Sequence, residues 1–231
     1  MKRIAVLTAL LFAALQIGYA QKVGLVLSGG GAKGAAHIGV IKALEENGIP
    51  IDYITGTSAG AIVGSLYAMG YTPEEMVELM LSEEFSYWQT GTVENEYKYY
   101  FKRPDPTPEF GHFSIDMTDS LQVKASFFPQ SLINPIQMNQ AFMALFSQAT
   151  AKAGWNFDNL FVPFRCVASD IYSKKAIIFK NGDLGDAVRA SMTFPFFFQP
   201  IWKDSVPIFD GGIYDNFPVG PMKEAFHPDF I

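Results

Sequence analysis

A serine between two glycines is the first residue in this sequence whose setting suits chemistry. It lies in the run Gly56-Thr57-Ser58-Ala59-Gly60, where an extended apolar stretch changes to a helical pattern. This spacing is that of a nucleophile elbow, in which a tight turn from strand to helix lifts a serine hydroxyl clear of the sheet. Glycines suit both flanks because the turn brings backbone segments close together. The run predicts Ser58 as a nucleophile, although an ordinary strand-to-helix turn can have the same spacing.

Asp210 is the best-placed base for such a serine. It ends an apolar, strand-like run and is followed by Gly211 and Gly212, which leave space for another stretch of backbone. An aspartate of ordinary pKa, about 3.9, is a weak base, so Asp210 would need a dry site and a direct hydrogen bond to the serine. On those terms a dyad of Ser58 and Asp210 is possible, and the alternative is an ordinary aspartate in a turn.

The three histidines are alternative bases. His227 follows Ser58 and Asp210 in the chain order of α/β-hydrolase triads, but it lies in a polar tail. His37 falls inside an expected helix, and His112 lies in an irregular segment. Among the histidines, His227 is therefore the one that we keep as an alternative partner of Ser58.

A third glycine-rich turn, Gly29-Gly30-Gly31-Ala32-Lys33-Gly34, follows the apolar run 23–28. The backbone N–H groups of Gly29, Gly30 and Gly31, at the start of a helix, are suited to stabilise the oxyanion that forms when a serine attacks an ester. The same glycines, with Asp52, also match a dinucleotide-binding fingerprint, which would leave Ser58 and Asp210 without a role. A nucleotide phosphate loop is disfavoured because Lys33 is followed by glycine and not by serine or threonine.

The elements around these turns alternate between strand and helix patterns, which predicts an α/β fold. We expect a three-layer sandwich in which helices cover both faces of a mainly parallel central sheet. Because the carboxyl ends of parallel strands share one edge, the three glycine-rich turns should meet there. The expected strands are 23–28, 51–55, 161–168, 175–179 and 206–210, and the expected helices are 35–47, 59–68, 72–81, 137–152 and 183–192.

Residues 84–136 interrupt this regularity with an aromatic, proline-rich stretch that includes Pro104, Pro106 and Pro108. One interpretation is an irregular excursion packed on the domain. The other is a lid or an apolar wall for an acyl chain, since exposed aromatic patches are often functional.

Composition excludes several classes of protein. Hydrophobic residues make up 49% of the chain and charged residues 17%, which excludes a disordered chain. The net charge of −6 argues against a nucleic-acid partner, but an aromatic content of 15% is compatible with a membrane surface. Cys166 is the only cysteine, so no internal disulfide is possible and a buried thiol is expected. No acidic cluster has the spacing of a calcium loop, and we expect no metal and no cofactor.

Residues 1–20 have the pattern of a secretory signal peptide. Lys2 and Arg3 precede an apolar run from 4 to 15, and small residues lie before the expected cleavage at Gln21. A transmembrane anchor is disfavoured because the run is too short to cross a bilayer. We therefore expect one domain, residues 21–231, exported to the periplasm, the outer membrane or the medium.

The three motifs, in this order, resemble the patatin-like phospholipase family. The similarity extends through 35–40, 187–191 and 215–219. It implies a serine acyl hydrolase of the lipase or phospholipase A type, with a role in lipid catabolism. Ser58 would be the acylated nucleophile, Asp210 its base and Gly29 to Gly34 the oxyanion loop, with Lys33 at the family's usual basic position. The implied partners are a phospholipid or other lipid ester and a membrane surface, and no cofactor is implied.

The sequence departs from the family pattern at two places. Ser28 stands where many members have aspartate, which should not alter the chemistry. The chain stops at 228–231, inside an apparent new strand, where family domains usually continue. Exported bacterial members often carry a membrane barrel, so we interpret the chain as the N-terminal part of a bacterial outer-membrane patatin protein, truncated at its C-terminus. A non-enzymatic binding or storage domain on the same fold is the alternative from another functional class.

Overall fold

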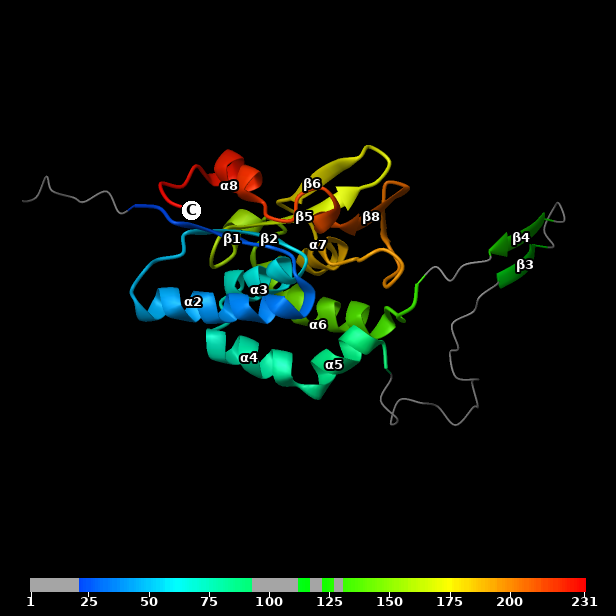
Figure 1. Ribbon diagram of the computed structural model, residues 1–231, viewed down its shortest axis with the longest axis horizontal. Helices are drawn as coiled ribbons and strands as arrows, with labels where there is room; N and C mark the ends of the chain where they lie inside the picture. Colours follow the sequence, from blue (N-terminus) through cyan, green and yellow to red (C-terminus); the bar gives the residue numbers. More distant parts are fainter. Residues whose placement is uncertain (1–20, 93–111, 117–121, 127–130) are drawn as a thin grey trace, which may run out of the picture.

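The computed structural model describes residues 21–92, 112–116, 122–126 and 131–231, and a six-stranded sheet lies at its centre (Figure 1). The predicted α/β fold, with helices on both faces of the sheet, is confirmed. The strands of this sheet are β1 (Gly24–Leu27), β2 (Tyr53–Thr57), β5 (Phe164–Asp170), β6 (Lys175–Phe179), β7 (Ile201–Lys203) and β8 (Val206–Asp210). The α-helices are α2 (Ala36–Glu46), α3 (Ala59–Ala68), α4 (Pro73–Leu81), α5 (Glu83–Thr90), α6 (Ile136–Lys152), α7 (Leu184–Ser191) and α8 (Val219–Phe226). β3 (His112–Asp116) and β4 (Gln122–Ser126) pair with each other as a two-stranded antiparallel sheet.

Successive residues of β2 pack against helices on opposite faces of the sheet. Ile54 is fully buried, and it lies close to Gly64 of α3, where the lack of a side chain lets the helix approach the sheet. On the other face, Tyr53 stacks on Phe226 of α8 with ring centroids 4.7 Å apart. Figure 1 accordingly shows α8 on one side of the sheet and α2, α3 and α6 on the other. This alternation makes a three-layer arrangement in which α3 is buried between the sheet and the outer helices.

Local signals in the sequence explain most helix boundaries. Thr72 caps α4 in a reciprocal capping box with Glu75, and Pro73 occupies the first turn. Asp183 caps α7 by accepting a hydrogen bond from the Asp186 N–H. The expected helices 72–81, 137–152 and 183–192 are therefore present to within one residue at each end. β7 and α8 were not predicted, because β7 has only three residues and the first turn of α8 contains Pro221.

The sheet near the glycine-rich turns differs from the expected parallel arrangement. β1, β2 and β5 are parallel, whereas β8 runs antiparallel to β5. Since β6 pairs with one edge of β5 over residues 166–170, β2 and β8 must share its other edge. Along that edge, Thr57 of β2 pairs with Val167, and Asp210 of β8 pairs with Ala168. The carboxyl ends of β2 and β8 thus meet head to head on consecutive residues of β5.

The structure also bears on the expected irregular segment and on the two ends of the chain. Residues 84–90 of the irregular segment belong to α5, while 93–111, 117–121 and 127–130 lie outside the described residues. The segment at 228–231 lies beside β1, with a parallel bridge between Val23 and Phe230. Within the described ranges, no helix is long and apolar enough to cross a bilayer. Residues 1–20 also lie outside the described residues, so the signal peptide stays a prediction.

Candidate active site

Ser58 lies between β2 and α3 on a strained turn. Its dihedral angles are φ 54° and ψ −120°, which a residue with a Cβ rarely adopts, at a typical cost of about 1–3 kcal/mol. The turn is crowded: a Cβ at Gly60 would collide with the Leu27 carbonyl of β1, and a Cβ at Gly56 with the Gly60 carbonyl. Both glycines of the predicted elbow are therefore required by close backbone contacts.

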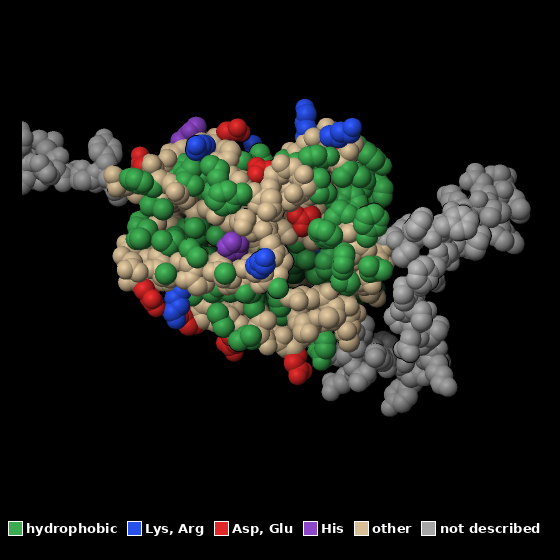
Figure 2. Space-filling view, in the orientation of Figure 1, with side chains coloured by type: hydrophobic (Ala, Val, Ile, Leu, Met, Phe, Trp, Pro, Cys, Tyr) green, Lys and Arg blue, Asp and Glu red, His purple; other side chains and the backbone are tan. Residues whose placement is uncertain are grey.

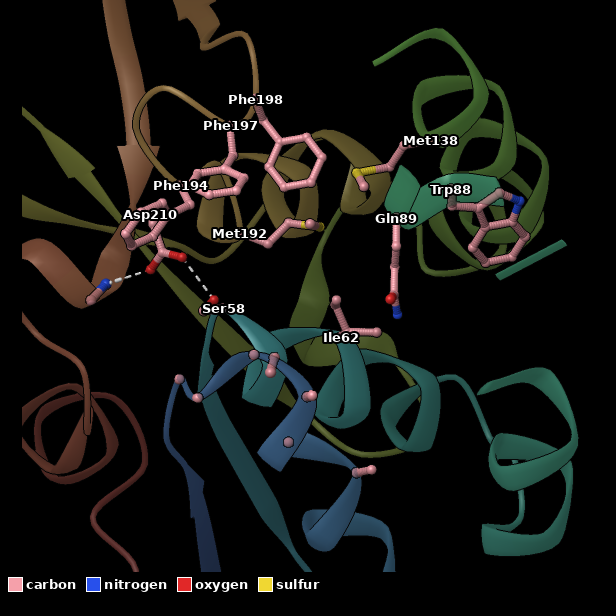
Figure 3. Close-up of a pocket in the computed structure, with 18 of the residues that line it drawn as sticks. Ser58, Ile62, Trp88, Gln89, Met138, Met192, Phe194, Phe197, Phe198 and Asp210 are labelled. Atoms are coloured by element: carbon pink, nitrogen blue, oxygen red, sulfur yellow. Dashed lines mark hydrogen bonds between the residues drawn. The ribbon is translucent and has the colours of Figure 1, made fainter. Parts of the chain in front are cut away.

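The Ser58 hydroxyl donates a hydrogen bond to Asp210, with Oγ and Oδ2 2.7 Å apart (Figure 3). The other carboxylate oxygen, Oδ1, accepts from the Gly212 N–H at 2.7 Å. Asp210 is 6% exposed, and this burial raises the pKa of its carboxyl, while the bonds from Gly212 and Ser58 partly oppose the rise. A carboxylate of raised pKa in direct contact with a serine is a better proton acceptor than an exposed aspartate.

The two histidines whose side chains are described lie elsewhere. His227 ends α8 in a left-handed conformation, and α8 packs on β1 and β2 across the sheet from α3. The His37 ring hydrogen-bonds the Ser28 carbonyl through Nε2 at 2.9 Å, which supports the turn after β1. His112 belongs to β3, and its side chain is outside the described residues. The hydrogen-bond partner of Ser58 is thus an aspartate.

The glycine-rich turn after β1 lies beside the serine but differs from expectation at its first residue. The Gly29 N–H donates to the Asn216 carbonyl at 3.1 Å, so it is not free to bind an oxyanion. Within the part of the chain that the structure describes, the N–H groups of Gly30 and Gly31 have no acceptor. Neither has the N–H of Ala59 at the start of α3, the helix that begins next to Ser58. Lys33 is exposed and does not line the cavity beside Ser58.

That cavity has a volume of about 960 Å³ and is largely apolar. Figure 3 shows Ser58 and Asp210 at one end and Trp88, Gln89 and Met138 toward the other. The residues that line it come from the glycine-rich turn, α3, α4, α5, α6, the segment after α7, and the end of β8 with the turn that follows it. Among the lining residues that the structure describes, Asp210 is the only charged one. The cavity is thus suited to an uncharged, elongated group such as an acyl chain.

The dinucleotide interpretation does not fit the geometry. Asp52 lies just before β2, at the end of the parallel strands away from the glycine-rich turn. Its carboxylate pairs with Lys22 at 2.8 Å and accepts from the Val23 N–H. A ribose bound near the glycines would therefore be out of its reach.

Comparison with known proteins places this geometry in a family. The model of the patatin-like phospholipases matches residues 25–223. The chain belongs to the patatin-like phospholipase family. Two curated relatives of this patatin-like domain are the patatin-like phospholipase domain-containing protein ZK370.4 of Caenorhabditis elegans and lysophospholipase NTE1 of Pyricularia oryzae. The first is 29% identical over 87% of this chain and the second 32% identical over 88%. The chain spans 12% and 11% of their respective lengths.

A solved structure shows the same patatin-like fold. VipD from Legionella pneumophila superposes with a TM-score of 0.53 at 18% sequence identity, over 86% of this chain and 47% of VipD. In the described part of the patatin-like domain, no group of three or more His, Cys, Asp or Glu side chains could hold a metal ion.

The backbone carbonyls of the segment 215–218 accept hydrogen bonds from β2 and from the turn after β1. The sequence analysis did not assign this role. The Thr57 hydroxyl donates to the Asp215 carbonyl at 2.9 Å, and the Thr55 hydroxyl donates to the Pro218 carbonyl at 3.0 Å. With the bond between Gly29 and Asn216, this segment links the turns after β1 and β2 to the end of β8. The proximity of 215–219 to the aspartate motif was the available signal, but its bonds come from backbone atoms that a sequence does not locate.

Ser191 is a second residue of the patatin-like site whose role the sequence did not reveal. Its hydroxyl accepts a hydrogen bond from the Ser58 N–H at 2.9 Å and donates one to the Val167 carbonyl at 2.5 Å. Val167 is the residue of β5 that pairs with Thr57 at the head-to-head junction. Ser191 is fully buried, so both bonds are shielded from water. It holds the strained backbone of Ser58 against β5.

Replacing Ser191 with alanine should misplace the nucleophile. We expect kcat for a soluble aryl ester to fall by about ten- to a hundredfold with little change in KM, because the backbone of Ser58 loses its support while the cavity is unchanged. Ser191→Thr should restore more activity than Ser191→Val, since the two side chains have the same shape and only threonine has the hydroxyl. Ser65→Ala is a control: Ser65 is equally buried, and its hydroxyl donates to the Ile62 carbonyl within α3. Equal kcat values for the threonine and valine variants would contradict the positioning role.

Proposed function

We propose that this chain is a serine acyl hydrolase that cleaves carboxylic ester bonds of lipids through a dyad of Ser58 and Asp210. The observation that carries the proposal is the 2.7 Å hydrogen bond from Ser58 Oγ to Asp210 Oδ2 at one end of an apolar cavity. Membership of the patatin-like phospholipase family supports the reaction class. The fungal relative named a lysophospholipase supports a phospholipid as the substrate, and the apolar lining supports an acyl chain as the group that the cavity holds.

The arrangement supports a two-step reaction. Asp210 takes the proton of Ser58 as Oγ attacks the ester carbonyl carbon, and the carbonyl oxygen becomes an oxyanion. The free N–H groups of Gly30, Gly31 and Ala59 are the donors that we assign to this oxyanion, and one such donor typically contributes about 10²- to 10³-fold in rate. Asp210 then protonates the leaving alcohol, which leaves an acyl group on Ser58. In the second step Asp210 activates a water that releases the fatty acid, and the serine recovers its proton.

A fluorophosphonate probe tests the nucleophile directly. Ser58 Oγ should attack phosphorus and displace fluoride, and digestion followed by mass spectrometry should place the adduct on Ser58. Because only the ionised form of Asp210 can accept the serine proton, the labelling rate should fall as the pH is lowered. Burial raises the pKa of Asp210, so this fall should occur at a higher pH than an exposed aspartate would give. An adduct on another residue, or an unlabelled protein that hydrolyses esters, would overturn the assignment.

Location and context are further parts of the proposal. The pattern of residues 1–20 supports export to the periplasm, the outer membrane or the medium, in a bacterial protein that acts in lipid catabolism. N-terminal sequencing of the protein recovered from a bacterial host should give Gln21 as the first residue. An N-terminus at Met1 in the cytoplasmic fraction would contradict export.

A further inference from the structure

Exposed aromatic and aliphatic side chains border the cavity beside Ser58. We call the following set the aromatic rim: Phe194, Phe196, Phe197, Ile213 and Tyr214. Three of them, Phe194, Phe197 and Ile213, also line the cavity, so the rim is continuous with its mouth. In Figure 2, hydrophobic side chains gather beside the hollow, over the part of the molecule where Figure 1 shows the chain between α7 and β8. No member of the rim is charged.

The rim is held in place from inside the protein. Arg189 is 3% exposed, and it donates to the Thr193 hydroxyl and to the Gln199 carbonyl, which flank the segment 194–198. The guanidinium also lies over the Phe198 ring, 5.2 Å from its centroid. Burial lowers the pKa of Arg189 to about 10, so it stays charged at neutral pH. Arg189 therefore fixes both ends of the segment that carries the three phenylalanines of the rim.

Phe196 is the most exposed member of the rim. Its side chain is 74% exposed, and its φ of 68° is an unusual conformation for a residue with a bulky side chain. Its carbonyl accepts from the Leu132 N–H at 2.9 Å, which helps to fix this conformation. A strained backbone at an exposed aromatic ring costs stability, and such outliers are found mainly at functional sites. Exposed apolar patches, in turn, mark surfaces that contact another molecule.

The position of the rim at the mouth of the cavity indicates what kind of surface contacts it. A protein partner or a second copy that covered the rim would also obstruct the mouth of the cavity. A lipid bilayer could cover the same side chains and deliver acyl chains through that mouth. Phenylalanine and tyrosine are suited to the boundary between headgroups and acyl chains, and the absence of charge in the rim means that attraction to anionic lipids is not required.

We propose that the aromatic rim inserts into the interfacial region of a zwitterionic lipid bilayer, so that the mouth of the cavity faces the lipid. Phe196 enters the bilayer first, and Phe194 and Phe197 lie between the bilayer and the cavity. The choice of a bilayer rests on the proposed function, since it assumes that the cavity receives acyl chains. The physical driving force is the removal of aromatic surface from water.

Flotation with phosphatidylcholine vesicles tests the surface without hydrolysis if every protein also carries Ser58→Ala. The chain should float with the vesicles, and adding about 0.5 M NaCl should not release it, because the rim has no charges to screen. Phe196→Ser should weaken the partition constant about tenfold, the loss typical of one interfacial aromatic side chain. Phe161→Ser is the matched control: Phe161 is 76% exposed but precedes β5, at the end of that strand away from Asp210. Equal losses in the two serine variants, or binding only to anionic vesicles that salt abolishes, would overturn the proposal.

Turnover separates this inference from the proposed function. With Ser58 intact, Phe196→Ser should hydrolyse a soluble aryl ester as fast as the parent chain, because Phe196 does not line the cavity. The same variant should be slower than the Phe161→Ser control on phosphatidylcholine vesicles. A parent chain that hydrolyses no ester yet shows the expected flotation would contradict the hydrolase and support the docking surface. Normal ester turnover with no vesicle binding would support the hydrolase and contradict the docking surface.

Discussion

Replacing Ser58 with alanine should lower the turnover of a soluble aryl ester by at least about 10³-fold, because the reaction loses its nucleophile and only the oxyanion donors and the cavity remain. The measurement is kcat and KM for the purified variant beside the parent chain. KM should change little, since the hydroxyl is small and the apolar cavity is preserved. Activity within tenfold of the parent would show that another group is the nucleophile.

The strain at Ser58 gives a second variant that separates catalysis from folding. Ser58→Gly should be as inactive as Ser58→Ala, but its thermal unfolding temperature should be higher. Glycine adopts φ 54° and ψ −120° without the cost of a Cβ, which is worth about 1–3 kcal/mol at such positions. If both variants are inactive and the glycine variant unfolds at no lower temperature than the parent chain, the loss of activity cannot be due to unfolding. An alanine variant that is at least as stable as the glycine variant would contradict the idea that strain is stored at the nucleophile.

Asp210→Asn should reduce kcat by about 10²- to 10⁴-fold, the usual contribution of a positioned base. The asparagine amide can still meet Ser58 Oγ and the Gly212 N–H, but it cannot take the serine proton. His227→Ala should keep turnover within about twofold, because that residue caps α8 on the other side of the sheet. If the histidine variant is the inactive one and the asparagine variant is not, a triad with His227 is the better mechanism.

Asp210→Asn should leave the folded protein at least as stable as the parent chain at neutral pH. The folded-state pKa of Asp210 is raised, so the folded protein binds the proton more tightly than the unfolded chain does. This contribution is fully favourable below the ordinary aspartate pKa, and it is lost as the pH rises through the raised folded-state pKa. At neutral pH the buried carboxylate therefore costs stability, and asparagine removes that cost. Thermal unfolding measured at neutral and at acidic pH should show the asparagine variant gaining on the parent only at neutral pH. A large loss of stability at neutral pH would contradict this account.

Much of the site could be predicted because its demands are local. The turn at Ser58 needs glycine at 56 and 60 for steric reasons, and those reasons can be read from the types of residue alone. The hydrophobic runs that became β1, β2 and β5 are short and continuous, as expected of buried strands. Asp210 was predicted because it ends an apolar, strand-like run and the two glycines after it leave space for another stretch of backbone.

Other parts depend on contacts between segments distant in sequence. Nothing in 206–210 shows that β8 runs antiparallel to β5, because a buried strand has the same pattern in either direction. Gly29 was assigned to the oxyanion from its place in the motif, but its N–H is taken by a carbonyl 187 residues away. Ser191 was visible only as part of the resemblance, since its two partners are backbone atoms of Ser58 and Val167.

The pairing of both β2 and β8 with β5 sets the distance between Ser58 and Asp210. Val167 pairs with Thr57, the residue before Ser58, and Ala168 pairs with Asp210. The two reacting residues are therefore positioned by neighbouring residues of one strand. If β8 slipped by one residue along β5, the sheet could keep its layers, but the carboxylate would shift by about 3.3 Å and turn to the opposite layer. Inserting or deleting one residue in β8 should therefore abolish ester hydrolysis.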